Sequence, residues 1–169
     1  MNNLIRLVDG AARLVDEDPW QLVRQDEDVP GNARLILPLA QWRERQSDAV
    51  LTGRQPSRDG LWLAPDDEVE SLAICLPALP LIAVDFPTFR DGRGYSQAYL
   101  LRTRLGWCGE LRAVGDVLRD QLSHMRQCGF DSFAVRGDKS AEDALKGLAG
   151  MSVQYGRSVI EPRPLFRRR

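Results

Sequence analysis

The sequence predicts a single α/β domain. Its sheet is expected to be mostly parallel, built of βα units and either open or shaped like an incomplete barrel, with a short N-terminal β arm. Short apolar runs alternate with helical stretches through the second half of the chain, which is typical of βα units. Residues 81–84 (LIAV) carry no polar side chain, as expected for a parallel strand covered on both faces. A closed barrel of eight units takes about 250 residues, whereas this chain has 169.

The N-terminal arm is predicted over residues 1–30, the α/β domain over 31–160 and a basic tail over 161–169. Three short strands bounded by acidic turns are expected to form a meander in the arm. They cover residues 3–8, 11–15 and 20–24. An incomplete barrel leaves a sheet edge or face open, and these strands or a second subunit could cover it.

The middle of the chain predicts three strands and two helices. The apolar residues 35–37 form a strand, and the proline that follows suits the first turn of a helix over 38–46. A strand is expected at 49–52 and an edge strand at 61–63. A helix is expected over 65–75, because it would begin with a proline and three acids at its positive end.

The second half predicts three strands, each followed by a helix. Gly129 would end one of these helices in the left-handed conformation. Ser140, followed three residues later by Asp143, would cap another. The expected strands are 81–84, 111–114 and 131–135, and the expected helices are 95–105, 116–128 and 140–148.

Two polar side chains fall on or beside the apolar faces of these helices. Arg102 lies inside the apolar sector of helix 95–105, so it should meet a carboxylate or a bound anion, or extend to solvent. His124, the only histidine, lies at the margin of the apolar arc of helix 116–128. A structural role is expected for it, and catalysis is the weaker alternative.

A candidate anion site is predicted beyond the carboxyl ends of the parallel strands, where ligands bind in such sheets. The loop after strand 81–84 carries arginines, glycines and hydroxyls just before a helix. Arginine forms bidentate bonds to oxyanions, and the first turn of a helix has free N–H groups. The predicted anion-binding residues are Thr88, Arg90, Arg93, Gly94, Ser96 and, after the last strand, Arg136. The alternative is an exposed turn whose arginines are solvated.

Asp85 and Asp116 are the candidate acid–base residues, since each follows a predicted strand at the same rim of the sheet. Two structural alternatives remain open. Asp116 could be an ordinary N-cap of the next helix, and Asp85 could pair with Arg90, Arg93 or Arg102 for structural reasons.

Several classes of protein lack support in the sequence. Cys75, Cys108 and Cys128 form no C-x-x-C pair, and the P-loop motif and a complete G-x-G-x-x-G are absent, so no metal and no cofactor is predicted. Cys75 and Cys128 are expected to be buried thiols. No apolar run spans a bilayer and no leader-like segment is seen, so a cytoplasmic protein without membrane contact is expected.

Charge is unevenly spread along the chain. Residues 1–80 hold 14 acidic and 8 basic side chains, a net charge of −6, whereas residues 81–169 hold 10 acidic and 15 basic ones, a net charge of +5. The basic tail is a single short cluster without a nucleic-acid reader motif, so no nucleic-acid partner is predicted.

Three stretches carry a family resemblance: FPTFRDGRGYSQAYLLR over 86–102, LRAVGDVLRDQ over 111–121 and CGFDSF over 128–133. They resemble a proteobacterial family of small uncharacterised proteins encoded beside the assimilatory sulfite reductase haemoprotein, some of which are labelled oxidoreductases of sulfite reduction. The resemblance covers roughly residues 34–150 and implies a role in sulfur assimilation. It implies no catalytic residues, and the chain lacks the cofactor motifs of an oxidoreductase.

Two functions are therefore expected as alternatives. The first is an accessory protein of assimilatory sulfite reduction that binds the reductase haemoprotein or a small oxyanion. The second is a stand-alone enzyme that holds a phosphate-, sulfite- or carboxylate-bearing substrate with the rim arginines and moves protons with Asp85 or Asp116. Leu100 points away from the core face of its helix, which suggests a second packing surface, and a homo-oligomer is one way to fill it.

Overall fold

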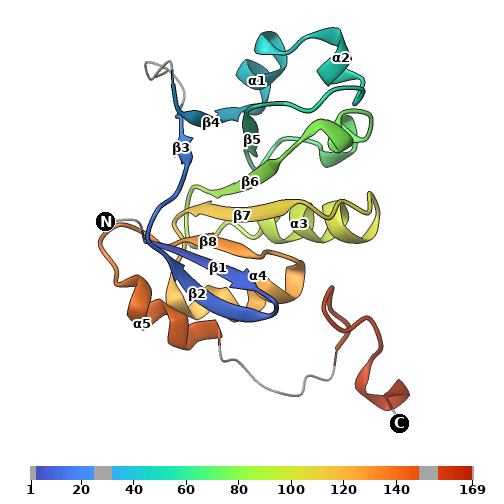
Figure 1. Ribbon diagram of the computed structural model, residues 1–169. Helices are drawn as coiled ribbons and strands as arrows, with labels where there is room; N and C mark the ends of the chain where they lie inside the picture. The colour runs from blue at the N-terminus through green and yellow to red at the C-terminus, as the bar shows by residue number, and fades with distance from the viewer. Residues whose placement is uncertain (1–2, 25–31, 149–155, 169) are drawn as a thin grey trace.

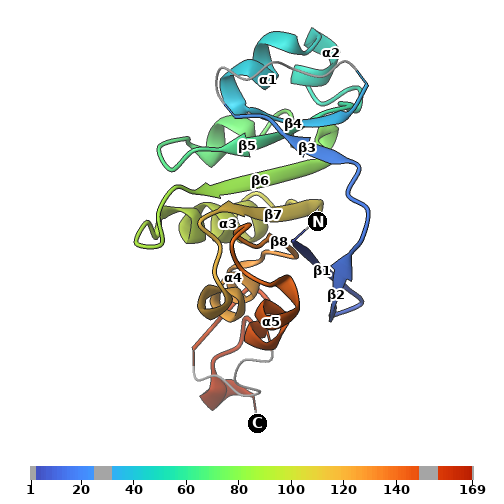
Figure 2. The ribbon, with the colours of Figure 1, turned by 90° about the vertical axis from the view of Figure 1, so that its left-hand side faces the viewer.

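The computed structural model describes residues 3–24, 32–148 and 156–168, and it confirms an α/β fold with a mostly parallel sheet (Figure 1). The sheet has eight strands in the order β2-β1-β8-β7-β6-β5-β4-β3 and curls into a half-barrel (Figure 2). The six strands from β3 to β8 are parallel, and β1 joins antiparallel to β8 and β2. The strands are β1 Leu4–Val8, β2 Ala11–Val15, β3 Trp20–Leu22, β4 Arg34–Pro38, β5 Gly60–Leu63, β6 Leu81–Phe86, β7 Glu110–Gly115 and β8 Ser132–Ala134.

Helices cover one face of the sheet, with α3 and α4 behind β6, β7 and β8 in the view of Figure 1. The main core lies between these layers. The α-helices are α1 Leu39–Arg45, α2 Asp48–Leu51, α3 Arg93–Thr103, α4 Leu122–Cys128 and α5 Ala141–Leu145. Short 3₁₀ turns join them at η1 Val69–Leu72, η2 Leu76–Ala78, η3 Arg119–Gln121, η4 Lys146–Leu148 and η5 Leu165–Arg167.

Strand β6 shows how the two faces of the sheet are built. All six of its residues are buried, as its unbroken apolar run predicts. Val84 and Phe86 join the main core under the helices, whereas Leu81 and Ala83 join a smaller apolar cluster on the opposite, inner face. This alternation continues to Asp85, which is therefore carried at the end of the strand on the inner face.

The N-terminal strands do not form one meander. β1 and β2 form a hairpin that extends the sheet beyond β8, whereas β3 pairs parallel with β4 at the other edge. The connection over residues 16–19, here called the strap, passes over the inner face. Asp18 in the strap accepts a hydrogen bond of 2.6 Å from Nη1 of Arg112 on β7. The arm thus covers both edges of the sheet.

Three predicted elements in the middle of the chain were wrong. Residues 49–52 lie largely in helix α2, where Asp48 occupies the favourable first turn. β5 is an interior strand between β4 and β6 rather than an edge. The helix expected over 65–75 is reduced to η1, because the side chain of Gln97 binds the carbonyl oxygens of Ala64 and Asp67 at 2.8 and 2.9 Å.

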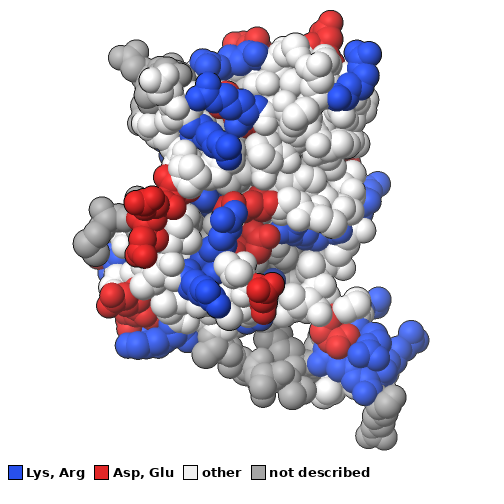
Figure 3. All heavy atoms as spheres, viewed as in Figure 1, with Lys and Arg blue, Asp and Glu red and all other residues white. Residues whose placement is uncertain are grey.

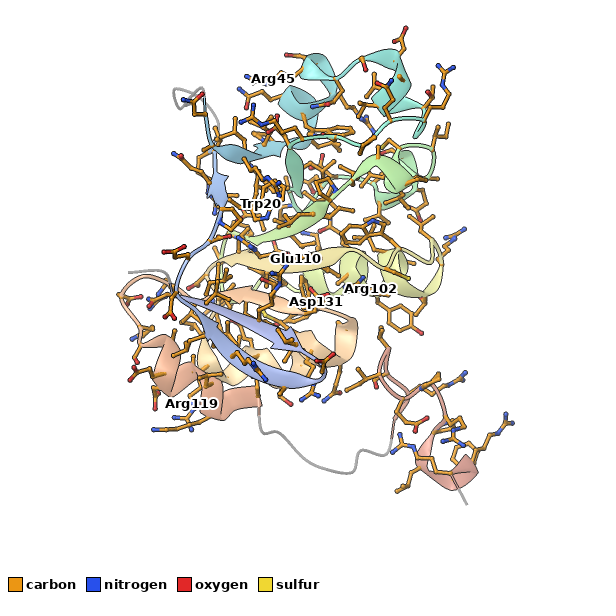
Figure 4. The ribbon with its side chains drawn as sticks, in the orientation of Figure 1. Trp20, Arg45, Arg102, Glu110, Arg119 and Asp131 are labelled. Atoms are coloured by element: carbon orange, nitrogen blue, oxygen red, sulfur yellow. The ribbon has the colours of Figure 1, made fainter. Side chains whose placement is uncertain are left out.

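Arg102 meets a carboxylate, as its place on the apolar side of α3 predicts. Its Nη2 donates to Asp131 at 3.1 Å, and its other nitrogens donate to the carbonyl oxygens of Trp107, Gly109 and Gly129 (Figure 4). Burial raises the pKa of the Asp131 carboxyl, and the charge of Arg102 opposes this rise. The guanidinium therefore ties the end of α3 to the loops before β7 and β8.

Candidate functional site

The carboxyl ends of the parallel strands surround a hollow of about 440 Å³. This rim hollow is lined by Arg24, Asp85, Phe86, Pro87, Gly115, Asp116 and Arg136. The residues come from the ends of β3, β6, β7 and β8 or from the loops just beyond them. The hollow therefore occupies the part of the fold where parallel α/β sheets bind ligands.

Arg24 and Asp85 form the first ion pair of the hollow. Nη1 of Arg24 donates to Oδ1 of Asp85 at 2.8 Å, and the guanidinium lies 5.3 Å from the ring centre of Trp62. The side chain of Asp85 is 9% exposed and that of Arg24 is 39% exposed. The buried carboxylate and the aromatic ring thus orient a guanidinium that still reaches solvent.

Arg136 forms the second ion pair. Its Nη1 donates to Oδ1 of Asp116 at 2.6 Å, and its Nε and Nη2 donate to the two oxygens of Asp138 at 2.6 and 3.0 Å. These bonds raise the pKa of Arg136 and lower that of Asp138. A guanidinium has five N–H groups, so the contacts with Asp116 and Asp138 fix Arg136 without using all of its donors.

Asp116 also shapes the loop that follows β6. Its Oδ2 accepts a hydrogen bond from the backbone N–H of Phe89 at 2.7 Å, and its own N–H donates to the carbonyl of Phe86, also at 2.7 Å. Asp116 therefore does not cap helix α4, which begins at Leu122. The N-cap alternative was wrong, and the carboxylate instead joins Arg136 to the β6–α3 loop.

Gly115 permits the close approach of β6 and β7 at the floor of the hollow. Its φ is +93°, and a Cβ atom at this position would lie 2.4 Å from the carbonyl oxygen of Phe86 and 2.7 Å from Oδ1 of Asp85. Only glycine adopts this conformation readily. The absence of a side chain here lets Asp85 and Asp116 approach the hollow from adjacent strands.

The structure brings together only part of the predicted site. Asp85, Asp116 and Arg136 line the rim hollow, whereas the other predicted residues, which lie between β6 and the first turn of α3, do not. Thr88, Arg90, Arg93 and Ser96 are exposed.

The first two residues of α3 have roles within the protein. Arg93 donates to Asp91 at 2.7 Å, which lowers the pKa of the Asp91 carboxyl, and it also pairs with Asp66. Gly94 is buried against Phe86, whose ring atoms would lie 2.7 Å from an added Cβ. These contacts hold the start of α3 against the preceding loop and against β6.

Arg24 is the site residue that the sequence did not reveal. Its strand was expected in an N-terminal meander, but β3 runs parallel to β4 and so directs Arg24 to the same rim as Asp85. Ligands bind beyond the carboxyl ends of parallel strands, so Arg24 would be a candidate once β3 is known to run parallel to β4. Such pairing depends on contacts remote in sequence.

His124 lies outside the hollow, in a cluster on α3 and α4. Its ring centre is 4.6 Å from that of Tyr95, and its Nε2 lies 3.8 Å from Sγ of Cys128. Burial raises the pKa of the Cys128 thiol to about 11. A neutral thiol against an aromatic stack suits packing better than nucleophilic chemistry.

The described residues contain no group of three or more His, Cys, Asp or Glu side chains placed to hold a metal ion. Across residues 3–24, 32–148 and 156–168, no helix has the length and apolar character needed to cross a membrane.

Comparison with known proteins yields one match. A family model described as "Bacterial protein of unknown function (DUF934)" matches residues 60–166, which is more than half of the chain. No curated protein and no solved structure matches the chain significantly. The matched region includes β5 to β8 and every residue of the rim hollow except Arg24.

Proposed function

We propose that this chain, which belongs to the DUF934 family of bacterial proteins of unknown function, binds a small oxyanion in the rim hollow and serves sulfite reduction as an accessory protein. The observation that carries the oxyanion part is the convergence of Arg24 and Arg136 on one hollow at the strand ends. The sulfite part is supported by the resemblance of residues 86–133 to proteins encoded beside the sulfite reductase haemoprotein.

The carboxylates of the hollow act in this proposal as supports for the arginines. Asp85 and Asp116 hold guanidiniums that remain about two-fifths exposed. A guanidinium locked before binding loses less conformational entropy when a ligand arrives. Sulfite, sulfate and phosphate all present oxygens in a geometry that a guanidinium fork can bind.

The test is calorimetric titration of the full chain with sulfite, sulfate and phosphate. Arg136→Gln should weaken binding by roughly tenfold to a hundredfold, the loss expected for one charge-assisted contact. Arg136→Lys keeps the charge but loses the fork, and an intermediate loss is expected. Arg119→Gln is the matched control, because Arg119 pairs with Asp143 on an exposed surface and does not line the hollow. Equal binding by wild type and Arg136→Gln would contradict the proposal.

A second pair of variants distinguishes the hollow from the β6–α3 loop. Arg93 already pairs with Asp91 and Asp66, and neither Arg90 nor Arg93 lines the hollow. The double variant Arg90→Ala, Arg93→Ala should therefore bind the oxyanion as the wild type does. If binding is lost in this variant and kept in Arg136→Gln, the site is the loop.

The partner version of the accessory role is tested with the sulfite reductase haemoprotein itself. We expect the two purified proteins to elute together from a size-exclusion column at low salt. Separate elution at both low and moderate salt would contradict binding to the reductase, and only the oxyanion part of the proposal would remain.

The enzyme alternative uses the same hollow, and one observation favours it: two carboxylates, Asp85 and Asp116, face one space beside two guanidiniums. They would move protons to or from a bound anionic substrate. Hydrolysis of p-nitrophenyl phosphate that is lost in Asp85→Asn and Asp116→Asn, and kept in Arg119→Gln, would support this alternative over simple binding.

A further inference from the structure

Residues 156–168, here called the tail segment, are organised by their own hydrogen bonds. Arg168 donates to the carbonyl oxygens of Arg163 at 2.7 Å and Gly156 at 3.1 Å. The N–H of Ser158 donates to the carbonyl oxygen of Glu161 at 2.9 Å, and the N–H of Glu161 donates to Oγ of Ser158 at 3.0 Å. The segment thus presents its side chains from a defined loop, and it lies apart from the sheet in Figure 1.

The tail segment exposes apolar and basic side chains together. Ile160 is 59% exposed, Leu165 39% and Phe166 62%. Four arginines and one glutamate give the segment a net charge of +3, and Figure 3 shows the basic side chains gathered there. Exposed apolar residues ringed by charge are typical of a surface that docks on another protein.

A groove with apolar and acidic side chains lies at the open end of the β1–β2 hairpin, where β1 starts and β2 ends. It has a volume of about 880 Å³ and runs between the end of β2 and the start of α5. Its apolar lining includes Leu14, which is 38% exposed, and Val15. Its charged lining is Asp16, Asp18, Asp138, Lys139 and Glu142. Asp18 and Asp138 are held within the chain by Arg112 and Arg136, so the acidic border of the groove is formed by Asp16 and Glu142. These acids lie beside the apolar lining, and together they complement the tail segment.

The tail segment is held away from the groove of its own chain. The N–H of Val159 donates to the carbonyl of Gln127 at the end of α4 at 2.9 Å. The neighbouring Arg126 donates to the carbonyl of Gly10, in the turn before β2. The groove instead lies where β2 ends, at Val15. Docking between copies joins the two surfaces without breaking these bonds.

We propose that the tail segment of one copy docks in the groove of a second copy, with Leu165 and Phe166 against Leu14 and the arginines facing the acidic border. If each copy gives its tail segment to the other, the contact is reciprocal and closes as a twofold dimer. The groove shares no lining residue with the rim hollow, and the two sites meet at Asp138, which lines the groove and holds Arg136.

The test is sedimentation velocity of the full chain across a dilution series at low and moderate salt. A dimer is expected, and added salt should weaken it because the contact is partly electrostatic. The tail variant Leu165→Ser, Phe166→Ser and the groove variant Leu14→Arg should each raise the dissociation constant by roughly tenfold or more. Ile74→Ser, a change at an apolar residue that is 70% exposed elsewhere, is the control and should leave the dimer intact.

Mixing the two variants provides the decisive comparison. Neither variant can form a tail–groove contact with itself, but a mixed pair keeps one: the tail of the groove variant with the groove of the tail variant. We therefore expect dimers in the mixture and monomers in each variant alone. A monomeric wild type, or a dimer that survives in both variants, would overturn the proposal, and circular dichroism confirms that each variant is folded.

Discussion

At the scale of single residues, the rim hollow depends on a position where a side chain is absent. Gly115 has a left-handed φ and lies against the Phe86 carbonyl and the Asp85 carboxylate. Any β-carbon there both strains the backbone and moves Asp85 away from Arg24. The geometry of the site is therefore coupled to the stability of β7.

We expect Gly115→Ala to lower the free energy of unfolding by about 2 kcal/mol, since the alanine is strained at this φ and collides with β6. Urea denaturation measures the loss. Gly137→Ala is the control, because no atom lies within 4 Å of its added Cβ, and its effect should stay within about 0.5 kcal/mol. Equal stability of the two variants would contradict this account.

The three cysteines should differ sharply in reactivity. Burial raises the pKa of the Cys128 thiol to about 11 and also raises that of Cys75, whereas Cys108 is exposed. At pH 8 about one Cys128 thiol in a thousand is a thiolate. Mass spectrometry after brief N-ethylmaleimide treatment should find Cys108 modified first and the other two at least tenfold more slowly. In Cys108→Ser the fast reaction should vanish; its persistence would refute the assignment.

At the scale of elements, the strap is fastened to the sheet by a buried ion pair. Arg112 on β7 is 5% exposed and donates to both Asp18 of the strap and Glu110 of its own strand. Removing one partner of a buried pair leaves a charge without full compensation. The strap is thereby held on the inner face of the sheet, between the hairpin and β3.

Asp18→Ala should destabilise the fold by roughly 2 kcal/mol, less than the full cost of an orphaned buried charge because Glu110 remains bonded to Arg112. The exposed neighbour Glu17 provides the control, and Glu17→Ala should change the unfolding free energy by less than about 0.5 kcal/mol. Chemical denaturation of both variants makes the comparison. An Asp18→Ala protein as stable as wild type would show that the ion pair does not hold the strap.

Sequence reasoning at this scale succeeded where local chemistry decides the structure. Strand β6, the αL conformation of Gly129 and the Ser140 cap all follow from neighbouring residues. It failed where distant groups intervene, as when Gln97 takes the carbonyls of Ala64 and Asp67 and prevents a longer helix. The candidate site divides in the same way: the rule of strand ends finds Asp85, Asp116 and Arg136, whereas Arg24 follows only from long-range pairing of β3.

At the scale of the whole molecule, one sheet carries both the N-terminal arm and the domain after it. Ile5 and Val23 are among the most buried residues, and they lie in the segments that cover opposite edges of the sheet. Without these segments, β4 and β8 would expose unpaired backbone N–H and C=O groups.

A shortened chain that begins at Ala33 should therefore aggregate or lose cooperative unfolding, because both sheet edges and part of the core become exposed. Soluble yield and thermal denaturation by circular dichroism test this expectation. Removal of residues 161–169 is the control, since the described side chains there contribute no member of the buried core. Cooperative unfolding of the chain that begins at Ala33 would show that the arm is dispensable.

The pairing of β1 with β8 also sets an order of events during synthesis. Leu4 pairs with Ala134 and Ile5 with Phe133, so β1 must wait for β8, the last of the eight described strands in chain order. At about 5–20 residues per second, that wait lasts on the order of ten seconds. Throughout it, the nascent hairpin has no neighbour in the sheet, so β1 and β2 can join the sheet only after β8 has been made.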